Sequence, residues 1–165
     1  MKKLLFTALL FLTIMANAQN ISNNAIGLRS GSNDGFGYEI SYQRKLKKSN
    51  RFEIDLGLRN NDNFNFIKGV GLYQWVMPLD GDFNWFAGVG GGFGSWNYNE
   101  RFKKSNIFYT NGGTFLLVAG DIGVEYNFDF PLLVAVDFRP EFVLGDGFGR
   151  NFGPDIALSF RYKFN

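Results

Sequence analysis

The sequence contains no cysteine and no histidine. Without cysteine the chain has no disulfide, no thiolate nucleophile and no thiolate metal ligand. Without histidine, the catalytic triads and dyads that need an imidazole are excluded. Only 4 of the 165 residues are proline and only 19% are charged. This composition is typical neither of a disordered chain nor of a nucleic-acid-binding protein.

Only one long apolar run is present, and it lies at the N-terminus. Two lysines precede an apolar stretch that ends in the small-residue tripeptide Ala16-Asn17-Ala18. This order is typical of a secretory signal peptide, and the stretch is short for the alternative, a membrane anchor. We expect residues 1–18 to be removed, leaving one domain over residues 19–165. The removed segment holds two of the 17 basic residues and no acidic one, so the mature chain carries 15 of each and has no positive field to attract polyanions.

The rest of the chain alternates between apolar and polar residues, which is the period of β-strands. In residues 155–164 every even position is apolar or aromatic, and every odd position is small, polar or charged. Turn residues divide the chain into eight such runs: residues 25–30, 36–46, 51–60, 64–77, 83–96, 114–128, 132–144 and 152–164. Short turns alternate with longer connections, which predicts an all-β fold, an eight-stranded antiparallel up-and-down β-barrel with both termini at the short-turn end.

Periodicity alone does not say which face of such a barrel points inward. A soluble lipocalin-like barrel turns its apolar face in, and a membrane barrel turns it out. Most of the runs reach the 9–11 residues or so that a membrane strand needs. The polar face carries small residues such as Gly88 and Gly90, which suit a crowded lumen, and the apolar face is aromatic towards its ends, with Trp75 and Trp85 at one and Phe93 and Trp96 at the other. We therefore predict a transmembrane β-barrel with its apolar face towards lipid.

The signal sequence, the eight alternating strands and the aromatic last strand resemble a small Gram-negative outer-membrane β-barrel of the OmpA/OmpX type. The resemblance covers the whole mature chain and is one of architecture. Phe160, Tyr162 and Phe164 resemble the C-terminal signal read by the barrel-assembly machinery, with the difference that Asn165 follows the last aromatic residue. The resemblance implies an outer-membrane location and contact with outer-membrane lipid, lipopolysaccharide and the assembly machinery. The barrel enzymes of that compartment use histidine, so neither catalysis nor a metal or other cofactor is expected.

With the apolar face outward, the lumen receives eight acidic and six basic residues: Arg29, Glu39, Glu53, Asp55, Arg59, Lys68, Asp121, Glu125, Asp137, Arg139, Glu141, Asp155, Arg161 and Lys163. Buried charges are tolerated when they are paired, so the near balance of signs predicts a lumen plugged by ion pairs. A proton relay or an ion pathway is the alternative. One strand is ambiguous, because Lys68 and Gln74 share a face with Val70 and Leu72. We expect a β-bulge to change its register.

The longest connection, residues 98–113, is the candidate surface-binding loop. It carries a basic and aromatic group: Arg101, Phe102, Lys103, Lys104, Phe108 and Tyr109. Such a loop fits lipopolysaccharide phosphates, another cell or a host ligand, and the alternative is a solvated loop without a partner. The sequence thus predicts an outer-membrane barrel with a structural or surface-interaction role. A narrow pore for small solutes and a soluble periplasmic carrier of an apolar ligand are the alternatives.

Overall fold

The computed structural model describes residues 21–31, 37–60, 64–98, 112–144 and 152–165. It contains eight strands, β1 (Asn24–Gly31), β2 (Gly37–Lys47), β3 (Asn50–Asn60), β4 (Phe64–Asp80), β5 (Phe83–Tyr98), β6 (Gly113–Asn127), β7 (Leu132–Leu144) and β8 (Phe152–Phe164). The described residues form no helix that is long and apolar enough to cross a membrane. The predicted runs 132–144 and 152–164 coincide with β7 and β8, and the largest difference is the extension of β4 to Asp80.

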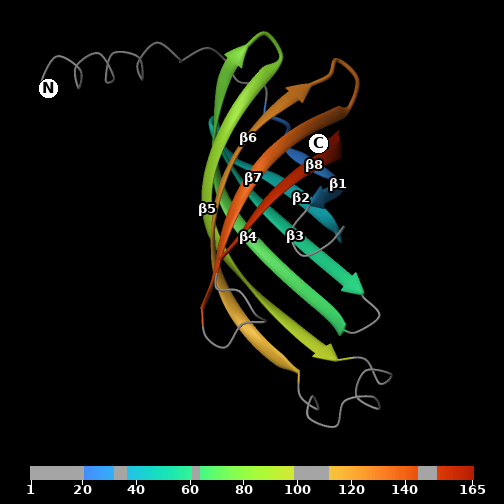
Figure 1. Cartoon of the computed structure of the whole chain (residues 1–165). Helices are drawn as coiled ribbons and strands as arrows, with labels where there is room; N and C mark the ends of the chain where they lie inside the picture. The colour runs from blue at the N-terminus through green and yellow to red at the C-terminus, as the bar shows by residue number, and fades with distance from the viewer. Residues whose placement is uncertain (1–20, 32–36, 61–63, 99–111, 145–151) are drawn as a thin grey trace, which may run out of the picture.

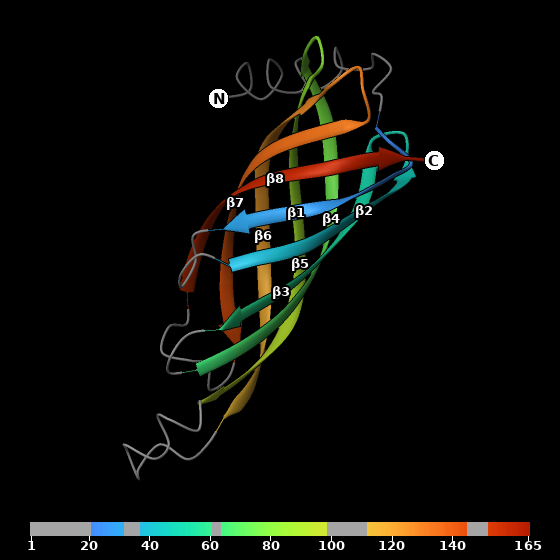
Figure 2. The ribbon, with the colours of Figure 1, turned by 90° about the vertical axis from the view of Figure 1, so that its right-hand side faces the viewer.

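Each strand pairs antiparallel with the next, and β1 pairs with β8 to close the barrel (Figures 1 and 2). Asn24 at the start of β1 lies opposite Phe164 at the end of β8. We call this end, which also holds the β2–β3, β4–β5 and β6–β7 turns, the terminal end, and the opposite one the loop end. β4, β5 and β6, with 17, 16 and 15 residues, are longer than β1 with 8.

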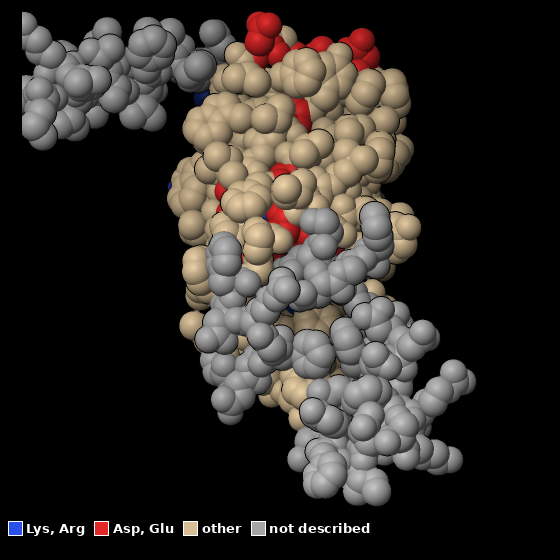
Figure 3. All heavy atoms as spheres, viewed as in Figure 1, with Lys and Arg blue, Asp and Glu red and all other residues tan. Residues whose placement is uncertain are grey.

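The apolar face of the wall points outward, as predicted. Along β3, Arg51, Glu53 and Asp55 are buried while the intervening Phe52 and Ile54 are exposed. A barrel strand necessarily sends successive side chains to opposite sides, so the period of two divides each strand between the lumen and the surroundings. The space-filling view accordingly shows an outer surface made mostly of uncharged residues, with acidic atoms at the terminal end and a few more visible midway along the wall (Figure 3).

The interior is layered. The terminal-end cluster consists of Ile21, Val76, Phe86 and Ala135. The loop-end cluster consists of Val70, Leu72, Phe115, Leu117 and Ala119, with Phe66, Trp96 and Val143 packed against it. Buried charged side chains are the other component of the interior.

Two expectations about individual strands were wrong. Lys68, Val70, Leu72 and Gln74 all point inward, and β3 and β4 pair without a register shift from Asn50 to Asn60. No bulge is needed because the lumen accommodates apolar side chains beside charged ones. Trp96 does not belong to the outward aromatic face, because its even position in β5 turns it inward onto the loop-end cluster.

The charged interior as the candidate functional site

Twelve of the fourteen charged residues assigned to the lumen are buried: Arg29, Glu39, Glu53, Asp55, Lys68, Asp121, Glu125, Asp137, Arg139, Glu141, Asp155 and Arg161. Together with the buried Arg51 we call them the charged layer. Lys163 is half-buried at the terminal end, where its Nζ donates to the Phe128 carbonyl oxygen at 2.8 Å. The side chain of Arg59 lies outside the described part of the structure.

Arg29 of β1 is surrounded by three carboxylates from three other strands. Its Nη1 contacts Glu39 Oε2 of β2 at 2.9 Å and Asp155 Oδ2 of β8 at 2.8 Å. Its Nε and Nη2 both donate to Asp137 of β7, with Nε at 3.1 Å from Oδ1. The planar guanidinium presents donors in several directions, so one arginine ties β1, β2, β7 and β8 together.

Arg139 reaches across the lumen. β7 and β3 lie on opposite walls, since four strand-to-strand steps separate them in a closed barrel of eight. Arg139 Nη2 nevertheless lies 3.0 Å from Glu53 Oε1 and 2.7 Å from Asp55 Oδ2, and its Nη1 lies 3.5 Å from Glu39 Oε2. Arg139 is completely buried. Its side chain therefore fills the middle of the barrel and joins the two walls.

Two further bases bridge strands that are not neighbours in the barrel. Lys68 of β4 lies between Glu141 of β7 at 2.8 Å and Glu39 of β2 at 3.2 Å. Arg161 of β8 contacts Glu53 of β3 at 3.3 Å and donates to Ser41 Oγ at 2.8 Å. Each link spans at least one intervening strand, so the charged layer is a set of cross-braces rather than a row of pairs along one strand.

Several members of this arrangement were missed by the sequence analysis. Arg51 of β3 is buried, and its Nη1 lies 2.5 Å from Glu125 Oε2 of β6 while its guanidinium stacks 4.8 Å from the centre of the Phe86 ring. Position 51 has the same parity as Glu53, so the period-two pattern contained this information. Gln74 also contributes, donating to Glu53 and Asp121. Neutral amides carry no charge pattern that would have marked them as lumenal partners.

Acidic residues outnumber basic ones in the charged layer, by eight to five. Every base in it contacts at least one carboxylate from another strand. Among the described residues, no group of acidic side chains has the arrangement of a metal site. The carboxylates thus interact with arginine, lysine and amide groups of the same chain, and what this geometry does chemically is to fill and brace the barrel.

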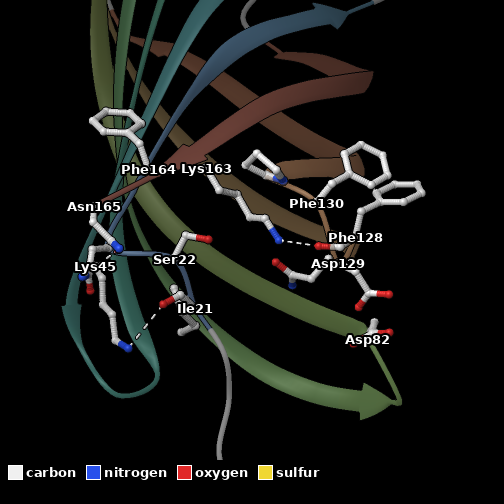
Figure 4. Close-up of a pocket in the computed structure, with 13 residues that line it drawn as sticks. Ile21, Ser22, Lys45, Asp82, Phe128, Asp129, Phe130, Lys163, Phe164 and Asn165 are labelled. Atoms are coloured by element: carbon white, nitrogen blue, oxygen red, sulfur yellow. Dashed lines mark hydrogen bonds between the residues drawn. The ribbon is translucent and has the colours of Figure 1, made fainter.

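A polar bowl opens at the terminal end, beside the apolar terminal-end cluster (Figure 4). It has a volume of about 540 Å³. Lys45 and Lys163 reach from its sides, and their Nζ atoms donate to the backbone oxygens of Ile21 and Phe128 (Figure 4). The side chain of Ile21 is buried against Val76, Phe86 and Ala135. The bowl therefore meets the terminal-end cluster at Ile21.

The other candidate residues lie outside the lumen or outside the described chain. Phe160, Tyr162 and Phe164 are exposed on the outward face of β8, where the alternation had placed them. The loop residues Arg101, Phe102, Lys103, Lys104, Phe108 and Tyr109 lie outside the described residues, as does the signal segment 1–18.

No family model and no curated protein matches the sequence. Solved structures do match. Neisserial surface protein A is 12% identical over 86% of this chain and 94% of its own, with a TM-score of 0.61. The N-terminal β-barrel domain of Pseudomonas aeruginosa OprF is 12% identical over 86% and 98%, with a TM-score of 0.63. The outer membrane enzyme PagL is 12% identical over 85% and 99%, with a TM-score of 0.55. The chain thus has the fold of small eight-stranded outer-membrane β-barrels, and because these proteins differ in function, the likeness shows the fold alone.

Proposed function

We propose that this chain is an integral outer-membrane protein with a structural or surface-interaction role, and that its barrel is plugged rather than open. The observation that carries the proposal is the reversal of its two faces, with paired charges inside and a ring of exposed apolar side chains outside. Every strand contributes to that ring: Leu28, Ile40, Leu56, Ile67, Val89, Ile122, Val136 and Leu158 are all at least 41% exposed. A soluble monomer rarely exposes so large an apolar surface, whereas a lipid-facing wall requires one.

This reversal argues against the soluble carrier. A lipocalin-like carrier of an apolar ligand needs an apolar cavity, and its wall is polar where it meets water. Here Glu39, Arg139 and Asp155 lie fully buried inside, and Leu56 and Leu158 are exposed outside. In a soluble carrier, these apolar side chains would meet water and these charged side chains would line the ligand cavity.

Two features of the interior argue against the narrow pore. The Arg139 side chain crosses to Glu53 and Asp55 on the opposite wall, and two apolar clusters fill further parts of the interior. Eight strands leave an interior that side chains can fill. Inside this filled interior the carboxylates contact basic and amide groups of the same chain, which supports a role without catalysis.

Bilayer recording tests the plug, and extraction tests the membrane. We expect the detergent-extracted protein to migrate differently on a gel before and after boiling, as a folded membrane barrel does, and to give no steady conductance in a planar bilayer. Steady, large conductance from the parent protein would contradict the plugged interior and favour the pore. Release of the protein with the periplasmic fraction would contradict the membrane location.

The proposal extends to orientation. Both termini belong to the terminal end, which in this proposal faces the periplasm, so the connection between β5 and β6 faces the outside of the cell. Brief trypsin treatment of intact cells is expected to cut near Arg101, Lys103 and Lys104 and to leave the buried bases of the charged layer intact. Cleavage that requires a permeabilised outer membrane would reverse the orientation.

A further inference from the structure

We propose that the β2–β3 hairpin is a binding site for anionic phospholipid headgroups at the terminal end of the barrel, an inference that rests on the proposed membrane location. Four of the five residues from Arg44 to Lys48 are basic, and Leu46 is the fifth. Arg44, Leu46, Lys47 and Lys48 are exposed. A basic group beside a bilayer attracts anionic headgroups through their phosphates.

Arg44 is held on the outward face of the wall. It lies opposite Phe52 of β3 in the ladder, and its Nη1 donates to Asn24 Oδ1 at 3.1 Å. The same Asn24 oxygen accepts a hydrogen bond from Tyr42 Oη at 2.8 Å. The guanidinium is thus fixed beside Phe52 and Tyr42, and aromatic rings of this kind sit at the headgroup level of membrane barrels.

The neighbouring lysines differ in direction. Lys45 turns into the polar bowl, where its Nζ donates to the Ile21 carbonyl oxygen at 3.3 Å (Figure 4). Lys47 is exposed at the end of β2, and Lys48 is exposed in the turn that follows. Arg44, Lys47 and Lys48 therefore form the headgroup site, and Leu46, which is 52% exposed between them, supplies an apolar contact for the acyl region.

The site is local to one of the three turns at this end. The β4–β5 hairpin carries the exposed Asp80 at the end of β4 and the exposed Asp82 in its turn, and the β6–β7 turn carries the exposed Asp129. A basic rim around the whole barrel would only indicate a general attraction to the membrane surface. A single basic hairpin at an end whose other two turns are acidic favours one place for an anionic lipid. A lipid suits this hairpin better than a protein, because Arg44 and Leu46 lie on the outward face of the wall beside the exposed Lys47 and Lys48.

The experiment compares lipid retention by two charge-matched variants. The full-length protein is folded into bilayers of phosphatidylcholine mixed with phosphatidylglycerol, extracted gently, and examined for bound lipid by native mass spectrometry. Lys47→Ser/Lys48→Ser removes two charges from the proposed site. Lys45→Ser/Lys163→Ser removes two charges from the polar bowl and serves as the control, with folding of each verified by the gel shift on boiling.

We expect the parent and the control to retain phosphatidylglycerol in preference to phosphatidylcholine, and the Lys47→Ser/Lys48→Ser variant to lose most of that preference, at roughly fivefold per basic residue. Adding Arg44→Gln should remove the remainder. Equal retention of both lipids by the parent overturns the inference while leaving a membrane barrel, and so does equal loss in the control. If the parent forms a dimer and only the Lys47→Ser/Lys48→Ser variant loses it, the hairpin binds a second copy of the chain and not a lipid. Failure of the parent protein to fold into the bilayer would instead contradict the proposed function.

Discussion

Phe138 and Arg139 are neighbours on β7, yet they meet opposite surroundings. Phe138 is 40% exposed on the outer wall, whereas Arg139 is completely buried among carboxylates from β2 and β3. In a water-soluble protein the burial of the two residues would be reversed. The contrast teaches that in this chain the apolar side chains are matched to an external apolar solvent, and the charges are matched to one another.

The two faces also differ in how their residues depend on one another. An outward residue such as Leu158 meets whatever surrounds the barrel, so another apolar side chain serves equally well. An inward residue such as Arg139 shares its carboxylates with other bases: Glu39 also contacts Arg29 and Lys68, and Glu53 also contacts Arg161. Substitutions should therefore be tolerated by class outside and by individual partner inside.

The largest effect is expected from Arg139→Ala. The substitution leaves Glu53 and Asp55 buried without their closest common partner, and breaking a buried ion pair by removing one member typically costs about 3–5 kcal/mol. Urea unfolding of the barrel in detergent or lipid vesicles, followed by the gel shift, measures the loss. We expect no new conductance, because the other ion pairs and the two apolar clusters still fill the interior.

Asp80→Ala is the control for this experiment, since Asp80 is exposed at the end of β4. A surface substitution of this kind usually changes the free energy of unfolding by no more than about 0.5 kcal/mol. If Arg139→Ala proved as mild as Asp80→Ala, the charges inside would not be coupled, and the contrast between the faces would fail.

A somewhat smaller effect is expected from Leu158→Arg on the outer face. Leu158 is 41% exposed and lies between Val136 of β7 and Ser30 of β1. Arginine near the middle of the lipid-facing wall of a membrane barrel costs about 2–4 kcal/mol. Folding yield and urea stability in lipid vesicles measure it, with Leu158→Phe as a neutral apolar control. If Leu158→Arg folds as well as Leu158→Phe, the outer wall does not face lipid.

Much of this architecture was present in the period of the sequence. Because a strand turns every second side chain to the same side, the alternation predicted all eight strands and the two faces of each. Strand length, the small residues of the polar face and the aromatic ends of the apolar face then predicted which face points inward, and with it the burial of residues such as Glu53 and Asp155. It would also have predicted Arg51 and Trp96 correctly, had parity been applied to them in place of residue type. The register change expected between Lys68 and Val70 was wrong because a lumenal face was expected to be uniformly polar.

The partners inside the barrel could not be predicted in the same way. That Arg139 meets Glu53 and Asp55 depends on β3 and β7 standing opposite each other and on the stagger between strands after closure. Neither follows from the pattern within one strand, because closure and stagger belong to the whole sheet. For the same reason the role of Gln74 as a bridge between Glu53 and Asp121 has no signature of its own in the sequence.

The smallest effect is expected from alanine substitutions of two glycines on the two faces, Gly94 of β5 and Gly69 of β4. A Cβ atom on Gly94 would point inward and overlap the Phe115 ring, which is buried and stacks on Phe66 with the ring centres 5.4 Å apart. A Cβ atom on Gly69 would point outward and lie 3.4 Å from Leu56 Cδ2 and 3.5 Å from the Phe93 ring, which is ordinary contact. Gly94→Ala should therefore lower the free energy of unfolding by about 1–3 kcal/mol, as overpacking of a core does.

Gly69→Ala should be neutral or stabilise the barrel by up to about 1 kcal/mol, because alanine loses less backbone entropy than glycine when a strand forms. Paired urea titrations in the same vesicles measure both changes. The added methyl group is identical and the two positions lie in neighbouring strands, so a difference between the variants reports only on which side of the wall is filled. Equal losses would mean that the outer face is packed as tightly as the lumen. If both variants were as stable as the parent, the Phe115 ring would move to accept the added methyl group, and the loop-end cluster would be loosely packed.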